Sequence, residues 1–241
     1  MEEKLIKTST KQRIFILIIA IVMLGSIIAS YIAIVLSGDN TNSSNTPVNQ
    51  ELISELTAKY EAKNAEVDAA AANLSSKYFT EFSGYQSEVK AYNETTANSE
   101  AVSSRDLKVG DGRELSDDDQ DYFAYYIGWC ADETIFDSSL DGNKLKAPLS
   151  ADVGLIEGWY AGMAGARLGG VREITIPGEL AYGESREICG GKNKPLKFIV
   201  MPIERTEPLA TLSDELNDIT TRLQYAYYGI DYDNLTVPEG E

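Results

Sequence analysis

No histidine occurs among the 241 residues, and cysteine occurs only twice, at Cys130 and Cys189. This excludes zinc sites built from Cys and His, and catalytic triads that need a histidine base. We therefore expect neither a metal nor a cofactor. Basic residues are also few: 21 Lys and Arg stand against 38 Asp and Glu, which gives a net charge of −17. Such a chain repels polyanions, so nucleic acid is excluded as a partner.

Charge is missing altogether from residues 14–36, IFILIIAIVMLGSIIASYIAIVL. As a helix these 23 residues would be about 34 Å long, enough to cross the hydrocarbon core of a bilayer. A cleaved signal peptide has a shorter apolar region of about 7–15 residues, so we expect a retained transmembrane helix. Cleavage after Ser37 is the alternative interpretation.

The residues on either side of this span predict its orientation. No basic residue follows the span before Lys59, whereas four precede it: Lys4, Lys7, Lys11 and Arg13. The positive-inside rule therefore places residues 1–13 in the cytoplasm. We expect a single-pass protein of the cell membrane whose C-terminal part is extracytoplasmic.

Residues 37–49 are rich in Asn, Ser and Thr, which is typical of a flexible linker. Apolar residues then recur at helical spacing, which predicts a helical spacer over residues 50–92 with a possible break at Gly84. Three interpretations are open: a solvated spacer, a coiled coil that dimerises the protein, or a hairpin with another helix of the chain. Lys63 and Lys77 interrupt the apolar stripe and favour the spacer or the hairpin.

A polar linker over residues 93–104 precedes a domain of different texture, residues 105–206. Alternating apolar residues predict strands at 122–129, 171–177 and 196–205, with one short amphipathic helix within 154–163. The fold class is therefore α+β: an antiparallel β-sheet, in the form of a half-barrel, wrapped around a short α-helix. Trp159 on that helix is either core packing or the floor of a pocket.

Three blocks of this domain resemble the FKBP-type peptidyl-prolyl cis/trans isomerases. They are GDGRELSDDDQDYFAYYIGWCADETIFDSS, LIEGWYAGMAGARLGGVREITIPGELAYGE and PLKFIVMPIER, in the family's order and near its spacing. The resemblance covers about a hundred residues. It implies catalytic roles for four residues: Tyr126, Asp137, Ile156 through its backbone N–H, and Tyr182 through its hydroxyl. It implies substrate binding by six more: Phe136, Leu145, Leu155, Trp159, Ile188 and Phe198.

The loop after Tyr182, ESREICGGKNK, departs from the apolar, proline-rich loop of the family, and Leu145 replaces a usual phenylalanine. Ile188 stands in for the loop's branched residue. By the family fold, Cys130 and Cys189 flank the same end of the pocket. The resemblance therefore implies a disulfide between them, in a compartment where disulfides persist.

Residues 207–241 are expected to form a helix from a cap at Ser213 to about residue 228, packed on the spacer helix, and then an acidic tail. The resemblance implies proline-containing polypeptides as clients and macrolide-type compounds as ligands. The expected function is a membrane-anchored, extracytoplasmic isomerase that assists the folding of exported proteins. The alternative is a peptide-binding or chaperone module of the same fold with little turnover.

Overall fold

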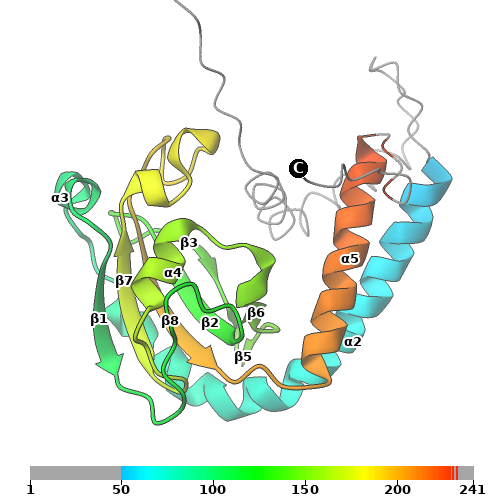
Figure 1. Cartoon of the computed structure of the whole chain (residues 1–241), viewed down its shortest axis with the longest axis horizontal. Helices are drawn as coiled ribbons and strands as arrows, with labels where there is room; N and C mark the ends of the chain where they lie inside the picture. The colour runs from blue at the N-terminus through cyan, green and yellow to red at the C-terminus, as the bar shows by residue number, and fades with distance from the viewer. Residues whose placement is uncertain (1–49, 229, 231, 233–241) are drawn as a thin grey trace, which may run out of the picture. The chain divides into compact units, whose positions relative to one another are not determined.

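The computed structural model describes residues 50–228, 230 and 232, and these form two compact units. The first contains residues 50–66 and 212–228, and the second contains Val67–Thr211 (Figure 1). Helix α2 (Gln50–Gly84) contributes its first half to one unit and its second half to the other. The predicted membrane span 14–36 lies outside the described residues. Among the described residues, no helix combines the length and the apolar character needed to cross a membrane.

The first unit is a pair of helices, formed by α2 and α5 (Leu209–Tyr227). Their contact is a small apolar cluster of buried residues: Ile53, Leu56, Leu223 and Ala226. Lys63, which interrupts the stripe, forms ion pairs with Glu215 and Glu66 at 2.7 and 2.8 Å. The predicted packing of the C-terminal helix on the spacer is confirmed, although α5 begins before the expected cap at Ser213.

The second unit is built on an antiparallel sheet, which confirms the α+β class. The strand order is β1 (Ser103–Lys108), β7 (Val171–Ile176), β8 (Leu196–Ile203), β2 (Phe123–Trp129) and β3 (Ile135–Ser138), with β6 (Leu149–Ser150) also paired to β2. A two-stranded hairpin of β4 (Leu140–Asp141) and β5 (Lys144–Leu145) follows β3.

The inner face of this sheet packs against the short helix α4 (Glu157–Met163), which lies across the strands in Figure 1. The helix comes close because glycines face β7. A Cβ on Gly158 would lie 2.2 Å from Cγ2 of Ile176, and one on Gly162 would lie 2.9 Å from Cγ2 of Ile174. Larger residues at either position would therefore push the helix away from the sheet.

The outer face is covered by the second half of α2. Phe82 is fully buried, and its ring lies 6.1 Å from that of Tyr125 on β2, with Tyr78 at 6.0 Å from the same ring. Ser75 Oγ accepts a hydrogen bond of 2.8 Å from the N–H of Leu145. This part of α2 is therefore a layer of the second unit.

The break expected at Gly84 is confirmed: α2 ends there and a 3-10 turn, η1 (Tyr85–Glu88), begins, so the helix does not continue to residue 92. A second boundary differs from the one expected. The predicted linker 93–104 contains helix α3 (Glu94–Ser99) and the start of β1. Asn93 caps α3, because its side chain accepts a hydrogen bond of 2.8 Å from the N–H of Thr96.

Candidate active site

Four aromatic rings meet on the inner face of the sheet, and we call them the ring cluster: Tyr126, Phe136, Trp159 and Phe198. Trp159 lies edge-on to Phe198 and Tyr126, with ring centroids 5.4 and 5.9 Å apart. Phe136 packs edge-on against Phe198 at 5.6 Å. Edge-to-face packing of this kind fixes ring orientations, and Trp159 and Phe198 are only 2% and 4% exposed.

Strand pairing explains why β2 and β8 can both contribute rings. Gly128 lies opposite Phe198 in the register, and a Cβ there would come within 2.6 Å of Phe136 and 2.8 Å of Phe198. A glycine at this position therefore makes room for both rings. Nothing in the local sequence pattern indicates that Gly128 has this role.

A polar pair, Tyr126 and Asp137, lies at the edge of the cluster. The hydroxyl of Tyr126 donates to Oδ2 of Asp137 at 2.5 Å, and Oδ1 of Asp137 accepts from the N–H of Ser138 at 2.8 Å. Burial raises the pKa of Tyr126 well above its usual value, and the neighbouring Asp137 carboxylate adds to the rise. Tyr126 therefore remains a donor at physiological pH, and the pair holds its ring in place.

The start of α4 supplies a backbone donor. Ile156 occupies the N-cap position in an extended conformation, is only 4% exposed, and accepts from the N–H of Trp159. Its own N–H donates to no group in the described part of the chain. The N–H of the preceding Leu155 instead donates to the Tyr160 hydroxyl at 2.8 Å. Among the described residues the Ile156 N–H therefore has no acceptor.

Tyr182 lies on the segment we call the rim loop, residues 177–195, which contains the turns η3 (Gly178–Leu180) and η4 (Gly183–Ser185). Burial raises the pKa of its hydroxyl to about 12; Arg186 lowers this pKa and Asp137 raises it. The guanidinium of Arg186 lies 4.9 Å from the centre of the Tyr182 ring. Within residues 50–228 the Tyr182 hydroxyl has no hydrogen-bond partner.

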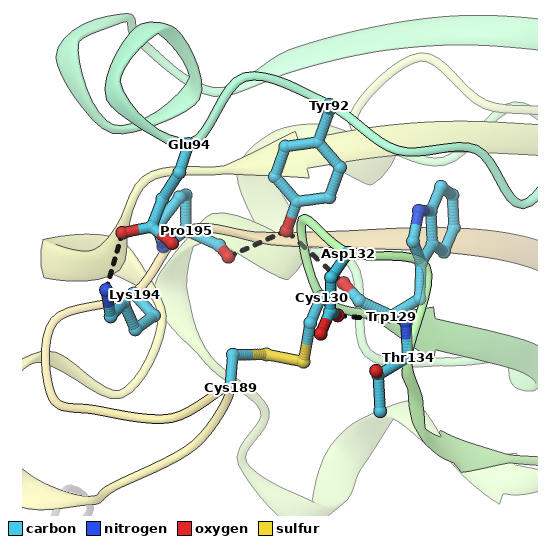
Figure 2. The surroundings of a disulfide bond; sticks show 9 residues. All are labelled: Tyr92, Glu94, Trp129, Cys130, Asp132, Thr134, Cys189, Lys194 and Pro195. Carbon is cyan, nitrogen blue, oxygen red and sulfur yellow. Dashed lines mark hydrogen bonds and ion pairs between the residues drawn. A yellow bond between two sulfur atoms is a disulfide. The ribbon is translucent and has the colours of Figure 1, made fainter.

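The tip of the rim loop is bonded covalently to the end of β2. Cys130 and Cys189 form a disulfide with a Cα separation of 5.4 Å, which confirms the predicted pairing (Figure 2). Cys189 has a positive φ of 55°, and Gly190 follows it at 78°. The bridge therefore fixes a turn whose backbone is costly for most residues.

Two residues with predicted substrate contacts lie on elements that carry none of the four rings. Leu145 is buried at 4% exposure on β5, where its backbone is bonded to Ser75 of α2. Ile188 is 8% exposed and pairs with Gly191 inside the rim loop. Their role in substrate binding stays a prediction.

Other residues of the site were not singled out from the sequence. The hydroxyl of Tyr122, which is fully buried, accepts a hydrogen bond of 2.9 Å from Nε1 of Trp159 and fixes its indole. Lys146 follows the β4–β5 hairpin and brings Nζ to 3.9 Å from Oδ1 of Asp137. The alternation YFAYYIGW could have indicated that Tyr122 is buried, whereas nothing local predicts the Lys146 contact. Among the described residues, no three His, Cys, Asp or Glu side chains could hold a metal ion.

Comparison with known proteins decides the family. A family model described as FKBP-type peptidyl-prolyl cis-trans isomerase matches residues 112–201. The FK506-binding protein of Neisseria meningitidis serogroup B is 35% identical over 102 residues, which are 41% of this chain and 88% of that protein. The chain belongs to the FKBP-type peptidyl-prolyl cis-trans isomerases. The FK506-binding protein 4 of Neurospora crassa is 40% identical over 109 residues, 44% of this chain and 22% of that protein.

The similarity to these isomerases covers less than half of the chain. A solved relative, the crystal structure of AtFKBP13, is 27% identical, covers 43% of this chain and 91% of that one, and has a TM-score of 0.36. Membership of the family makes the enzyme a peptidyl-prolyl cis-trans isomerase, which acts on Xaa-Pro bonds of peptides. The matched segment 112–201 contains the ring cluster, Asp137, Ile156 and Tyr182.

Proposed function

We propose that this isomerase is anchored in the cell membrane and catalyses prolyl isomerisation outside the cytoplasm, on exported proteins that are still folding. The observation that carries the catalytic part is the ring cluster, bordered by the Ile156 N–H and the Tyr182 hydroxyl. In this proposal the proline ring lies against Trp159. Macrolide-type compounds would occupy the same surface.

The residue types suit the reaction. Rotation about a peptide bond has a barrier of about 18–20 kcal/mol, because twisting ends amide resonance. The planar amide is more polar than the twisted one, so an environment poor in water and rich in aromatic surface favours the twisted form. The reaction needs no nucleophile and no general base. What it needs is a fixed substrate whose amide can turn.

Each polar group then has a limited task. The Ile156 N–H donates to a substrate carbonyl, and the Tyr182 hydroxyl donates to a second acceptor on the peptide. Tyr126 and Asp137 hold one another at 2.5 Å and thereby fix the wall of the cluster. Holding the flanking peptide while one bond rotates lowers the entropic part of the barrier.

Two features of the sequence support the location. The uncharged stretch 14–36 is long enough to span a bilayer and follows four basic residues, which favours a cytoplasmic N-terminus. The Cys130–Cys189 disulfide is typical of proteins that fold in an oxidising compartment. Both features support the proposal that residues 38–241 lie outside the cytoplasm.

A second candidate function is peptide binding or chaperone activity with little turnover. The rim loop favours it, because the loop carries Glu184, Arg186 and Glu187 where the family has an apolar tip, and the Arg186 guanidinium lies on Tyr182. This alternative predicts that the protein binds peptides tightly while their cis–trans isomerisation stays close to the uncatalysed rate.

The catalytic assignment is tested with the full chain in detergent. Cis–trans exchange of an Xaa-Pro peptide with an apolar Xaa is measured by NMR for the parent, Tyr182→Phe and a control, Tyr85→Phe, in the turn after α2. We expect Tyr182→Phe to lower kcat/KM by about threefold to tenfold, because one hydrogen bond to the substrate is lost. An unchanged rate would remove Tyr182 from the mechanism, and a parent rate equal to buffer would favour the binding function.

The location is tested by protease added to intact cells that carry tags at both ends of the chain. The proposal predicts that the C-terminal tag is digested while the N-terminal tag survives. The reverse pattern would refute the orientation. A soluble product that begins near Gly38 would show a cleaved signal in place of an anchor.

A further inference from the structure

Residues 89–99 precede the segment matched by the family and lie along the second unit; we call them the strap. Its backbone is bonded to the turn after β2: the N–H of Tyr92 donates to the carbonyl of Ala131 at 3.1 Å. The N–H of Ala91 donates to Oε1 of Glu133 at 2.9 Å, and the carbonyl of Lys90 accepts from Nε1 of Trp129 at the same distance. This turn also carries Cys130.

The strap also reaches the end of the rim loop. The Tyr92 hydroxyl donates to the carbonyl of Pro195 at 2.8 Å, and Glu94 pairs with Lys194 at 2.5 Å (Figure 2). One segment thus contacts the two places where the rim loop is anchored, namely its C-terminal end and, through Cys130, the disulfide to its tip.

Asn98 makes the contact that matters most for the site. Its Oδ1 accepts a hydrogen bond of 2.6 Å from the N–H of Gly178, and its Nδ2 donates to the carbonyl of Asn193 at 3.3 Å. Gly178 and Asn193 lie at the two ends of the rim loop. One amide side chain therefore joins both ends of the loop at its base.

The two ends of the rim loop are closely packed, so the hydrogen bonds of Asn98 also restrict the residues next to Tyr182. A Cβ on Gly178 would lie 2.2 Å from the carbonyl oxygen of Asn193. The N–H of Asn193 donates to the carbonyl of Gly183 at 2.8 Å, and Gly183 is bonded to Tyr182 in the chain. Asn98 is therefore two hydrogen bonds away from the residue next to Tyr182.

We propose that the strap is a positioning element of the isomerase, in which Asn98 closes the base of the rim loop and so places the Tyr182 hydroxyl beside the ring cluster. Asn98 touches no substrate in this arrangement. It acts through Asn193 and Gly183. The proposal rests on the donor role of Tyr182 in the proposed function.

The test uses the full chain with Asn98→Ala, Asn98→Asp and Asn93→Ala. Asn98→Ala removes both contacts, and Asn98→Asp keeps an acceptor for Gly178 but loses the donor to Asn193. Asn93→Ala is the matched control, because it removes a hydrogen bond within the strap and none to the rim loop. It should lower the melting temperature at least as much as Asn98→Ala, since N-caps contribute to helix stability.

Amide exchange of Gly178 and Asn193, followed by NMR, reports on the loop itself. We expect faster exchange at Gly178 in Asn98→Ala, because its N–H loses its acceptor. At Asn193 we expect faster exchange in both Asn98 variants, because its N–H bond to Gly183 depends on a closed loop base. Asn93→Ala should change neither amide. We expect kcat/KM to fall in Asn98→Ala, mostly in kcat, by at most the roughly threefold to tenfold expected for Tyr182→Phe, because Asn98 acts through the Tyr182 hydroxyl. Asn93→Ala should stay within about twofold of the parent.

A double-mutant cycle separates positioning from general stability. If Asn98 acts through Tyr182, Asn98→Ala should change the rate of Tyr182→Phe by less than about twofold. The proposal would be overturned if the double variant lost kcat/KM by the product of the two single-variant factors. It would also be overturned if Asn93→Ala and Asn98→Ala lowered kcat/KM equally. Faster exchange without loss of activity in Asn98→Ala would overturn the strap's role alone. Tyr182→Phe without any effect would overturn the proposed role of Tyr182 as well.

Discussion

Tyr125 and Tyr126 are neighbours on β2 whose side chains lie on opposite faces of the sheet. Tyr126 belongs to the ring cluster and donates to Asp137. Tyr125 is fully buried under Tyr78 and Phe82 of α2, and its hydroxyl has no hydrogen-bond partner in the described part of the chain. On the inner face the tyrosine hydroxyl is thus held by a hydrogen bond, whereas on the outer face the tyrosine is held by the apolar packing of its ring. We infer that inner-face changes alter rate and that outer-face changes alter stability.

The largest effect is expected from a phenylalanine on the outer face. Phe82→Ala should lower the free energy of unfolding by about 3–5 kcal/mol, because a fully buried ring is lost and leaves a cavity. The matched change on the inner face is Phe136→Ala, where the ring is only partly buried. Urea unfolding and NMR exchange rates on both variants check this. Equal stability losses, or a slow rate in folded Phe82→Ala, would break the comparison between the faces.

Tyr126→Phe should have the next largest effect. It removes a hydrogen bond to a carboxylate, which contributes about 1.5–3 kcal/mol, and it frees the wall of the ring cluster. We expect kcat/KM to fall by about tenfold or more. A variant that unfolds earlier in urea but turns over at the parent rate would show that the Tyr126–Asp137 pair is structural only.

Alkaline pH should destabilise both faces. Burial raises the pKa values of Tyr122 and Tyr125, and that of Tyr182 to about 12, above the value near 10 of an unfolded chain. Between about pH 10 and 12 the unfolded chain loses these protons and the folded one keeps them. Stability is therefore unaffected below pH 10 and falls above it, by about 1.4 kcal/mol per pH unit for each tyrosine.

The measurement is the urea midpoint between pH 8 and 11.5. In Tyr125→Phe the urea midpoint should fall less steeply with pH, because one tyrosine with a raised pKa has been removed and one proton fewer is lost on unfolding. A midpoint that rises with pH above 10 would contradict the sign of these pKa shifts.

The smallest effect is expected from Tyr125→Phe at neutral pH. Removing a buried hydroxyl without a partner should leave stability unchanged or raise it by up to about 1 kcal/mol. The isomerisation rate should not change, because the ring lies on the outer face. A loss above about 1 kcal/mol would indicate a bond to this hydroxyl and would weaken the contrast with Tyr126.

Much of the inner face could be predicted from the sequence. Strand alternation located β2, β7 and β8, and the spacing around Trp159 gave a short helix. The resemblance then supplied the rings and the disulfide that the structure brings together. Such patterns carry information because side-chain direction repeats every two residues in a strand and about every 3.6 in a helix.

The outer face could not be predicted in the same way. The apolar stripe of residues 53–92 indicates that a helix needs cover, but periodicity does not name its partner. The packing of Phe82 on Tyr125 therefore could not be predicted. The polar composition of residues 93–104 predicts a linker, although Asn98 forms hydrogen bonds to residues 80 and 95 positions later, at the two ends of the rim loop. The backbone N–H of Leu145 donates to Ser75 Oγ, 70 residues earlier, and nothing in the sequence pattern indicates this contact. Contacts at such separations leave no local periodic signal.

The disulfide has a consequence for what happens when the chain is cut. It joins positions 59 residues apart, and the enclosed ring contains Phe136, Asp137, Trp159 and Tyr182. Lys144 is exposed on the β4–β5 hairpin, within that ring. A protease that cleaves after Lys144 therefore opens a circle and does not release a fragment. The nicked enzyme would migrate as one species without reductant and as two with it, and Asp137 and Trp159, now on different pieces of chain, would remain joined through the bridge.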